Sequence, residues 1–120
     1  MFDHIGLKVR HLDASVRFYT AITEACGYGL CTSDNSGAGF GPAGEPVLWL
    51  YPVKDAAGPG LHIALRANDR AAVDRFHAAG LAAGGRDHGS PGLRADYSPS
   101  YYAAFLLDPD GNNVEAVCMS

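Results

Sequence analysis

The chain carries the same order of hydrophobic and polar positions twice. Residues 4–10 and 62–67 each alternate apolar with other side chains, which is typical of a strand with one buried face. Apolar residues at helical spacing follow both segments, over 12–22 in the first copy and 73–79 in the second. Each copy is therefore predicted to open with a strand and to continue as a helix.

Both predicted helices have recognisable signals at their ends. Asp13 is expected to cap the first helix, and Asn68 or Asp69 the second, because a side-chain oxygen can accept the free N–H groups of the first turn. Gly27 follows the first helix and is expected to end it. These signals place each helix between two strand-like segments.

Short apolar segments predict the remaining strands, which are expected at 28–32, 38–41, 47–51, 101–107 and 114–119. Residues 87–100, rich in Gly, Pro and Ser, are expected to form a loop that the second copy carries as an insertion. This order predicts an α+β fold, in which two βαβββ modules form a curled, barrel-like mixed sheet with the helices outside. The chain length suits one domain spanning residues 1–120, with repeat units at about 1–57 and 58–120.

Identical residues at matching positions support a duplication. Residues 4–27 align with residues 62–85 without a gap. The shared residues include His4/His62, Ile5/Ile63, Leu7/Leu65, Arg17/Arg75 and Phe18/Phe76. Continued through the Pro- and Gly-containing turn before each last strand, the alignment places Leu48 opposite Glu115. Two copies of one module indicate pseudo-twofold symmetry, which brings equivalent positions to face each other.

Three residues form a candidate metal site. His4 and His62 open the first strand of each copy, and Glu115 lies within the otherwise apolar last strand. A carboxylate among apolar residues is costly to bury unless it is paired or binds a cation. Two imidazoles and one carboxylate suit Fe(II), and they also suit Zn²⁺ or Mn²⁺. Taken one at a time, each residue has a simpler interpretation as a surface or structural side chain.

The same motifs resemble the vicinal oxygen chelate superfamily, which includes glyoxalase I, extradiol dioxygenases and bleomycin-resistance proteins. The resemblance rests on the two His-Ile-x-Leu strands and on the segment Asp108–Val117, and it covers nearly the whole chain. It implies that His4, His62 and Glu115 are the metal ligands. It also implies a homodimer and a substrate that chelates the metal through two adjacent oxygens.

One departure from the family narrows the expected activity. Glyoxalase I takes a fourth ligand from the last strand of the first module, where the alignment places Leu48, which cannot bind a metal. The resemblance therefore implies a dioxygenase- or transferase-like enzyme rather than a true glyoxalase I. The alternatives are a metal-free protein that binds an antibiotic or another small molecule, as bleomycin-resistance proteins do, and a member without catalytic activity.

Further candidates for the site come from the inserted segment and from the first module. Tyr101 and Tyr97 are candidate proton donors, and Arg94 is a candidate for binding an anion. Tyr102 and Trp49 are candidates for substrate contacts. Each of these side chains is also compatible with a purely structural role.

Composition excludes several other classes of protein. The formal net charge is −4 and no run of Lys or Arg occurs, which argues against nucleic acid as a partner. No apolar segment approaches the ~18 residues of a membrane helix, and no signal peptide is recognised. The three cysteines show no CxxC spacing, which favours reduced thiols and a cytoplasmic location. A small-molecule substrate and a homodimer remain the expected partners.

Overall fold

The structure is a computed structural model that describes residues 1–56 and 58–120. Module 1 contains β1 (Ile5–Val9), α1 (Leu12–Ala25), β2 (Gly29–Asp34), β3 (Gly37–Gly41) and β4 (Leu48–Pro52). Module 2 contains β5 (His62–Arg66), α2 (Arg70–Ala82), β6 (Arg86–Leu93), β7 (Tyr102–Leu107) and β8 (Asn113–Cys118). The predicted α+β class and the βαβββ order of both modules are confirmed. The predicted boundary between the units falls at residue 57, which lies outside the described residues.

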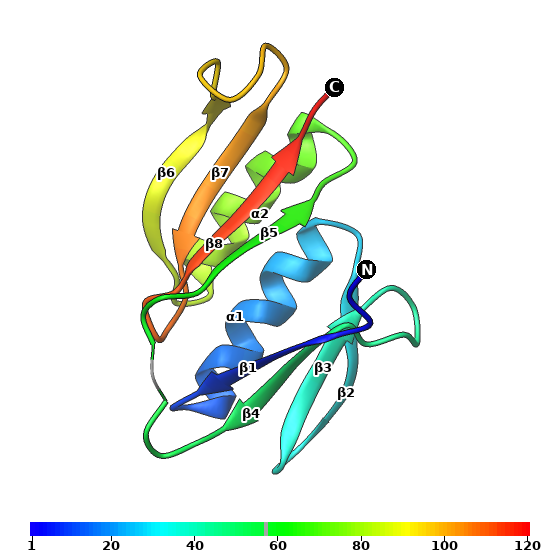
Figure 1. The fold of residues 1–120 in the computed structure, drawn as a ribbon, viewed down its shortest axis with the longest axis vertical. Helices are drawn as coiled ribbons and strands as arrows, with labels where there is room; N and C mark the ends of the chain where they lie inside the picture. The colour runs from blue at the N-terminus through cyan, green and yellow to red at the C-terminus, as the bar shows by residue number, and fades with distance from the viewer. Residues whose placement is uncertain (57) are drawn as a thin grey trace.

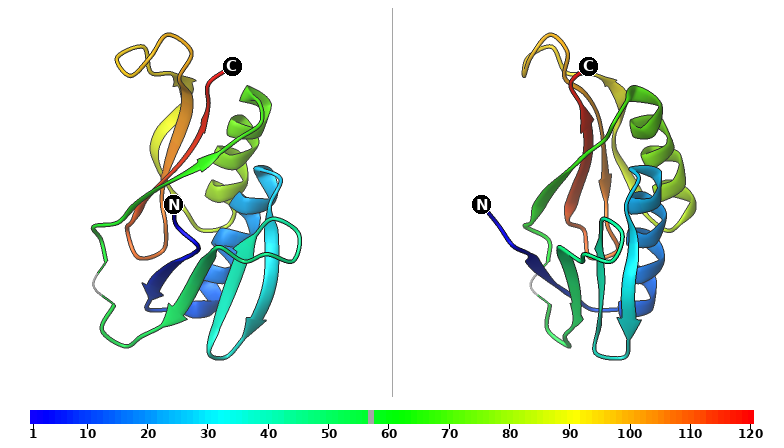
Figure 2. Two further views of the ribbon diagram at one scale, coloured as in Figure 1. Left: turned by 45° about the vertical axis from the view of Figure 1, so that its right-hand side comes forward. Right: turned by 90° about the vertical axis from the view of Figure 1, so that its right-hand side faces the viewer.

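Each module folds into a four-stranded mixed sheet with the same topology (Figure 1). The strand orders are β1-β4-β3-β2 and β5-β8-β7-β6, and in each sheet the first strand pairs in parallel with the last. The two sheets are hydrogen-bonded separately and do not close into a barrel. Both helices lie on one side of the sheets, where α1 packs against α2, and no helix of residues 1–56 or 58–120 covers the opposite side (Figure 2). We call this uncovered side the open face.

Alternation along the strands separates the core from the open face. In β1, Leu7 and Val9 are buried against the helices, whereas Lys8 between them is exposed. The helices contribute fully buried aromatic rings such as Phe18 and Phe76, each worth about 1.5–3 kcal/mol when removed from water. In module 2 the same alternation puts the even-numbered positions of β5 and the odd-numbered positions of β8 on the open face.

The two helices approach closely at Gly80. A Cβ atom on this residue would lie 2.2 Å from Cδ1 of Leu106 and 3.0 Å from Cγ2 of Ile22. No side chain larger than a hydrogen atom fits there without displacing the core. The glycine therefore sets the distance at which α2 packs over β7 and beside α1.

The predicted helix caps are confirmed for one helix and corrected for the other. The Asp69 side chain accepts a hydrogen bond from the backbone N–H of Ala72 at 2.8 Å, as expected for an N-cap. Asp13 does not cap α1, because the helix already begins at Leu12 and its N-cap is His11, which makes no capping bond with its side chain. Asp13 instead lies in the first turn, where a carboxylate favours the positive end of the helix dipole.

The predicted loop at 87–100 is wrong over its first half. Residues 86–93 form strand β6, which pairs antiparallel with β7. The pairing register shifts between Asp87 and Gly89 and again between Gly89 and Gly92. These irregularities break the alternation of apolar and polar residues, so the segment lacks the sequence pattern of a regular strand.

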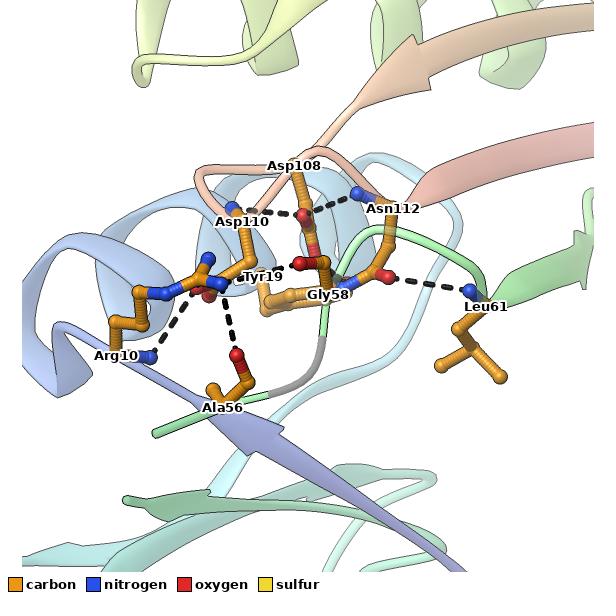
Figure 3. Close-up of polar contacts among 8 residues, drawn as sticks. All are labelled: Arg10, Tyr19, Ala56, Gly58, Leu61, Asp108, Asp110 and Asn112. Atoms are coloured by element: carbon orange, nitrogen blue, oxygen red, sulfur yellow. Dashed lines mark hydrogen bonds and ion pairs between the residues drawn. The ribbon is translucent and has the colours of Figure 1, made fainter. Parts of the chain in front are cut away.

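Contacts between the modules converge on the loop that precedes β8 (Figure 3). Tyr19 of α1 donates to Oδ2 of Asp108 at 2.7 Å, and both side chains are fully buried. Arg10, just after β1, donates through its backbone N–H and through Nη1 to Oδ1 of Asp110, at 3.2 and 3.1 Å. Its other Nη donates to the carbonyl oxygens of Ala56 and Gly58. These bonds fix one module against the other and hold the start of β8 in place.

Burial raises the pKa of Tyr19 well above its ordinary value, and the carboxylate of Asp108 acts in the same direction. The phenol therefore stays protonated and remains a donor to Asp108. In the described part of the chain, no helix combines the length and the apolarity needed to cross a bilayer.

Candidate functional site

Glu115 is a buried carboxylate on the open face of module 2. Its side chain is 3% exposed, although the face that carries it has no helix over it. His62 of β5 and Tyr101, the residue before β7, contact its two oxygens, and Phe105 of β7 is its partner across the strand pair. Burying a carboxylate is costly unless these contacts or a cation stabilise it.

His62 and Glu115 place two electron-pair donors side by side. Nδ1 of His62 lies 3.2 Å from the carbonyl oxygen of Asn113, which can only accept, so this nitrogen carries the hydrogen. In the neutral imidazole, Nε2 then presents a lone pair toward Oε1 of Glu115, 3.1 Å away. Two acceptors at this distance need a proton or a cation between them. A histidine that is oriented through its second nitrogen is the arrangement that protein metal sites use.

Tyr101 is hydrogen-bonded to the second carboxylate oxygen of Glu115. Its hydroxyl donates to Oε2, and its ring packs edge-on against Tyr97 with the ring centroids 5.0 Å apart. Burial raises the pKa of Tyr101 to about 12, and the hydrogen bond and negative charge of Glu115 contribute in the same direction. At neutral pH the Tyr101 phenol is therefore protonated and acts as a hydrogen-bond donor. The neighbouring Tyr97 side chain is 65% exposed.

His4 lies apart from this pair. Its Nδ1 lies 2.6 Å from Oδ1 of Asp3, and its side chain is 56% exposed. Among residues 1–56 and 58–120, no three or more His, Cys, Asp or Glu side chains are grouped so that they could hold a metal ion. The structure thus brings together two of the three predicted ligands, His62 and Glu115, and leaves His4 near the N-terminus of the same chain.

The strand register corrects the alignment of the two last strands. In module 1, Ile5 pairs with Leu48 and Gly6 with Trp49. In module 2, the equivalent Ile63 pairs with Val114 and Ala64 with Glu115. The counterpart of Glu115 is therefore Trp49, and Leu48 corresponds to the core residue Val114. The alignment from sequence was wrong by one position because the turns before β4 and β8 differ in length. Tryptophan has no carboxylate or imidazole ligand either, so the argument against a glyoxalase-type fourth ligand is unchanged.

The other candidate residues divide between the two faces of the sheets. Arg94 lies over the ring of Phe105, 5.3 Å from its centroid, and donates to the carbonyl oxygen of Ser90 at 2.7 Å. Its guanidinium is therefore on the same face as Glu115. Tyr102 points the other way, because its hydroxyl donates to Asp74 of α2 at 2.7 Å. Trp49 lies on the open face of module 1, where it stacks on Tyr51 with the ring centroids 6.4 Å apart.

Two residues of the site escaped the sequence analysis. Phe105 stacks on His62 with the ring centroids 6.4 Å apart, and Asn113 orients the imidazole through its carbonyl oxygen. The oxygen Oδ1 of Asn113 is buried and has no hydrogen-bond partner among the described residues. Phe105 could have been recognised, because alternation along the predicted strand puts it on the same face as the candidate residue Tyr101. A backbone carbonyl such as that of Asn113 gives no signal in the sequence.

The fold is that of the glyoxalase, bleomycin-resistance and dioxygenase proteins. The family model described as glyoxalase-like domain matches residues 4–117, and the chain belongs to this family. The resemblance inferred from the sequence motifs is thus confirmed. No curated protein sequence matches the chain significantly.

Solved structures agree with this assignment. A glyoxalase/bleomycin resistance protein from Albidiferax ferrireducens T118 is 30% identical with a TM-score of 0.83, and the match covers 98% of this chain and 97% of that one. A protein from Agrobacterium tumefaciens is 26% identical with a TM-score of 0.68, covering 100% and 98% of the two chains. A glyoxalase/bleomycin resistance protein/dioxygenase family enzyme from Burkholderia phytofirmans PsJN shares the fold at 17% identity, with a TM-score of 0.74 and coverage of 98% of each chain.

Proposed function

We propose that the protein is a metal-dependent enzyme that binds a small substrate through two adjacent oxygen atoms. In this proposal, His62 and Glu115 of one copy and His4 of a second copy hold a divalent cation. The observation that supports it is the 3.1 Å approach of Nε2 of His62 and Oε1 of Glu115, two atoms that require a positive charge or a proton between them. When bound, Fe(II), Zn²⁺ or Mn²⁺ would polarise the substrate oxygens, and Fe(II) alone of the three suits ring cleavage by O₂.

The chain's own residues prepare the two ligands. The carbonyl oxygen of Asn113 fixes the tautomer of His62, and the hydroxyl of Tyr101 holds Oε2 of Glu115, so that Oε1 is left for the cation. Phe105 and Tyr97 supply aromatic surface beside the pair, and Arg94 supplies positive charge over Phe105. Glyoxalase I uses a fourth ligand, and the position equivalent to Glu115 in module 1 is Trp49, which is not a metal ligand. This favours dioxygenase- or transferase-like chemistry over that of glyoxalase I.

A second copy is proposed because the described residues of one chain bring only two of the three candidate ligands together. His4 is exposed at the N-terminal end of β1, where a neighbouring molecule can reach it. The open face also exposes aromatic surface, since Tyr51 is 42% exposed and stacks on Trp49. Pairing the open face of module 1 with that of module 2 from another copy covers this surface and encloses the His62–Glu115 pair.

Elemental analysis of protein purified without added metal tests the ligand assignment. We expect one divalent ion per chain in the unaltered protein, and its loss in His62→Ala and in Glu115→Gln. His77→Ala is the matched control, because His77 bonds to Asp87, away from Glu115. Full metal content in His62→Ala, with an unchanged thermal midpoint, would exclude His62 as a ligand.

A mixing experiment tests whether the site is shared between copies. His4→Ala and Glu115→Gln proteins each lack a ligand at every site. If two chains share each site, a mixed dimer regains one complete site, so co-refolded protein recovers up to a quarter of the metal content of the unaltered protein for random pairing. No recovery in a mixture shown to contain mixed dimers contradicts the shared site.

A second candidate function is metal-free binding of a small molecule. It is favoured by an apolar hollow of about 310 Å³ between the modules, lined by Tyr28, Phe40, Val47 and Leu65 among others. This candidate predicts protein without metal whose thermal midpoint is the same with and without EDTA. The three cysteines are free thiols, which supports a cytoplasmic location for either function.

A further inference from the structure

A second hollow lies at the ends of β5 and β8, where Arg66, Val117 and the C-terminal residues line it. Figure 1 shows these two strands side by side. The volume of the hollow is about 540 Å³, which is the size of a small-molecule site. Tyr101 forms part of its wall and is hydrogen-bonded to Glu115, and Ala64, which also lines the hollow, pairs with Glu115 across the strands. A ligand in this hollow therefore lies next to the proposed reaction centre.

The lining of the hollow combines apolar surface with one cation. Ala64, Val117 and Met119 supply apolar surface, and Arg66 of β5 supplies a guanidinium. Arg66 is exposed, and among the described residues its side chain forms no ion pair. The main-chain oxygen of Ser120, which also lines the hollow, accepts a hydrogen bond from Arg70 at 3.2 Å. This oxygen is therefore bonded to Arg70, and Arg66 keeps its guanidinium without an ion-pair partner in the described part of the chain.

The surrounding charge is also positive, although the chain as a whole is acidic. The formal net charge is −4, yet Arg66 in the hollow and Arg94 on the same face of module 2 form no ion pair among the described residues. Glu115 is the acidic residue on the strands of this face in module 2, and His62 and Tyr101 already bind its oxygens. Guanidinium groups without an ion-pair partner attract an anionic ligand to the hollow.

We propose that the substrate is a small organic acid with an apolar body, whose carboxylate is bound by Arg66 in this hollow. A guanidinium presents two parallel N–H donors that match the geometry of a carboxylate. The apolar part of the ligand lies against Ala64 and Val117, and its remaining oxygens extend past Tyr101 toward Glu115. The inference rests on the proposed function for the orientation of the ligand, but binding of the carboxylate by Arg66 does not require the metal.

The test compares two probes of equal size, 3,4-dihydroxybenzoate and the neutral 3,4-dihydroxybenzamide. Calorimetric titrations are run on EDTA-treated and on metal-loaded protein at neutral pH. We expect the acid to bind at least about tenfold more tightly than the amide in both forms, because charge-assisted hydrogen bonds are stronger than neutral ones. Failure of the metal proposal leaves this preference intact in EDTA-treated protein, so the two results are distinguishable.

Variants assign the preference to one side chain. Arg66→Ala is expected to reduce the ratio of the two affinities to about one, and Arg66→Lys to restore part of it. Arg75→Ala is the matched control, because Arg75 is exposed on α2, on the helix side of the sheets. Equal binding of acid and amide to the unaltered protein overturns the proposal. A preference that survives in Arg66→Ala also overturns it.

Discussion

The hydroxyl of Tyr101 hydrogen-bonds to Oε2 of Glu115 and ties the segment before β7 to the middle of β8. This bond leaves only Oε1 of the carboxylate to face His62. Tyr101 is thus a positioning residue for Glu115, whatever ligand binds the pair. Its effect is separable from that of the neighbouring Tyr97, whose ring only packs against it.

Replacing Tyr101 by Phe removes the bond and keeps the ring. We expect metal affinity to fall by about 10- to 100-fold, the usual effect of losing a residue that orients a ligand, while His62 and Glu115 still bind. Competition with a chromophoric chelator measures the change. Tyr97→Phe serves as the control and should leave the affinity unaltered. An equal loss in both variants points to disturbance of the loop rather than of Glu115.

The raised pKa of Tyr101 predicts how the protein responds to alkali. The pKa of the phenol is about 12 in the folded chain and 10.0 in the unfolded one, so its contribution to stability is complete below pH 10.0. This contribution is lost as the pH rises from 10.0 toward about 12. Ultraviolet titration of phenolate, taken as the difference between unaltered protein and Tyr101→Phe, should show a transition only near the upper value. A transition near pH 10 would mean that the Tyr101 phenol is neither buried nor hydrogen-bonded to Glu115 as in the structure.

The contact between Tyr19 and Asp108 predicts a stability effect outside the functional site. Tyr19→Phe leaves a buried carboxylate without one of its donors, which should lower the free energy of unfolding by about 1–3 kcal/mol. Urea denaturation measures the change. In Tyr28→Phe the lost bond, to the backbone oxygen of Arg66, is exposed, and the change should stay within about 1 kcal/mol. A neutral Tyr19→Phe would show that Asp108 is satisfied by its own loop.

The close packing at Gly80 can be tested with a single methyl group. Gly80→Ala favours the helix intrinsically, but its Cβ would meet Leu106 at 2.2 Å, and overpacking of a core costs about 1–3 kcal/mol. We therefore expect a net loss of stability, measured as a lower thermal midpoint. At Gly29 of β2, an added Cβ has no atom within 4 Å, so Gly29→Ala should change the midpoint little. A stabilised Gly80→Ala would contradict the packing of α2 on β7.

Much of this architecture follows from patterns that are local in the sequence. Alternation predicted β1 and β5, and helical spacing predicted α1 and α2. The side-chain contact of His62 with Glu115 is not local, but it follows from the pairing of β5 with β8. Strand β6 was missed because its two register shifts remove the alternation on which the prediction depends. The position of His4 depends on contacts of the N-terminal residues, on which a repeat in the sequence gives no information.

The register of the last strands was the most consequential error. A one-residue slip in a strand moves a side chain to the other face of the sheet, so of Leu48 and Trp49 only one can face a ligand on the open face. Leu48 is 7% exposed and belongs to the core, whereas Trp49 lies on the open face. Pairing partners decide between the two residues, and these partners are set by turn lengths that the alignment did not resolve.

This register makes a prediction that the sequence alignment contradicts. Since Trp49 is the counterpart of Glu115, Trp49→Glu places a carboxylate on the open face of module 1, in the position where a fourth ligand is expected for a site shared by two copies. We expect metal affinity to rise by about tenfold or more, because an added anionic ligand strengthens binding of a divalent cation. Leu48→Glu is the decisive control. It buries an unpaired charge in the core, so it should lower the thermal midpoint strongly and leave the affinity of any folded fraction no higher than before. The opposite result, tighter metal binding in Leu48→Glu than in Trp49→Glu, would overturn the strand register, and with it the assignment of the open face as the ligand-binding side.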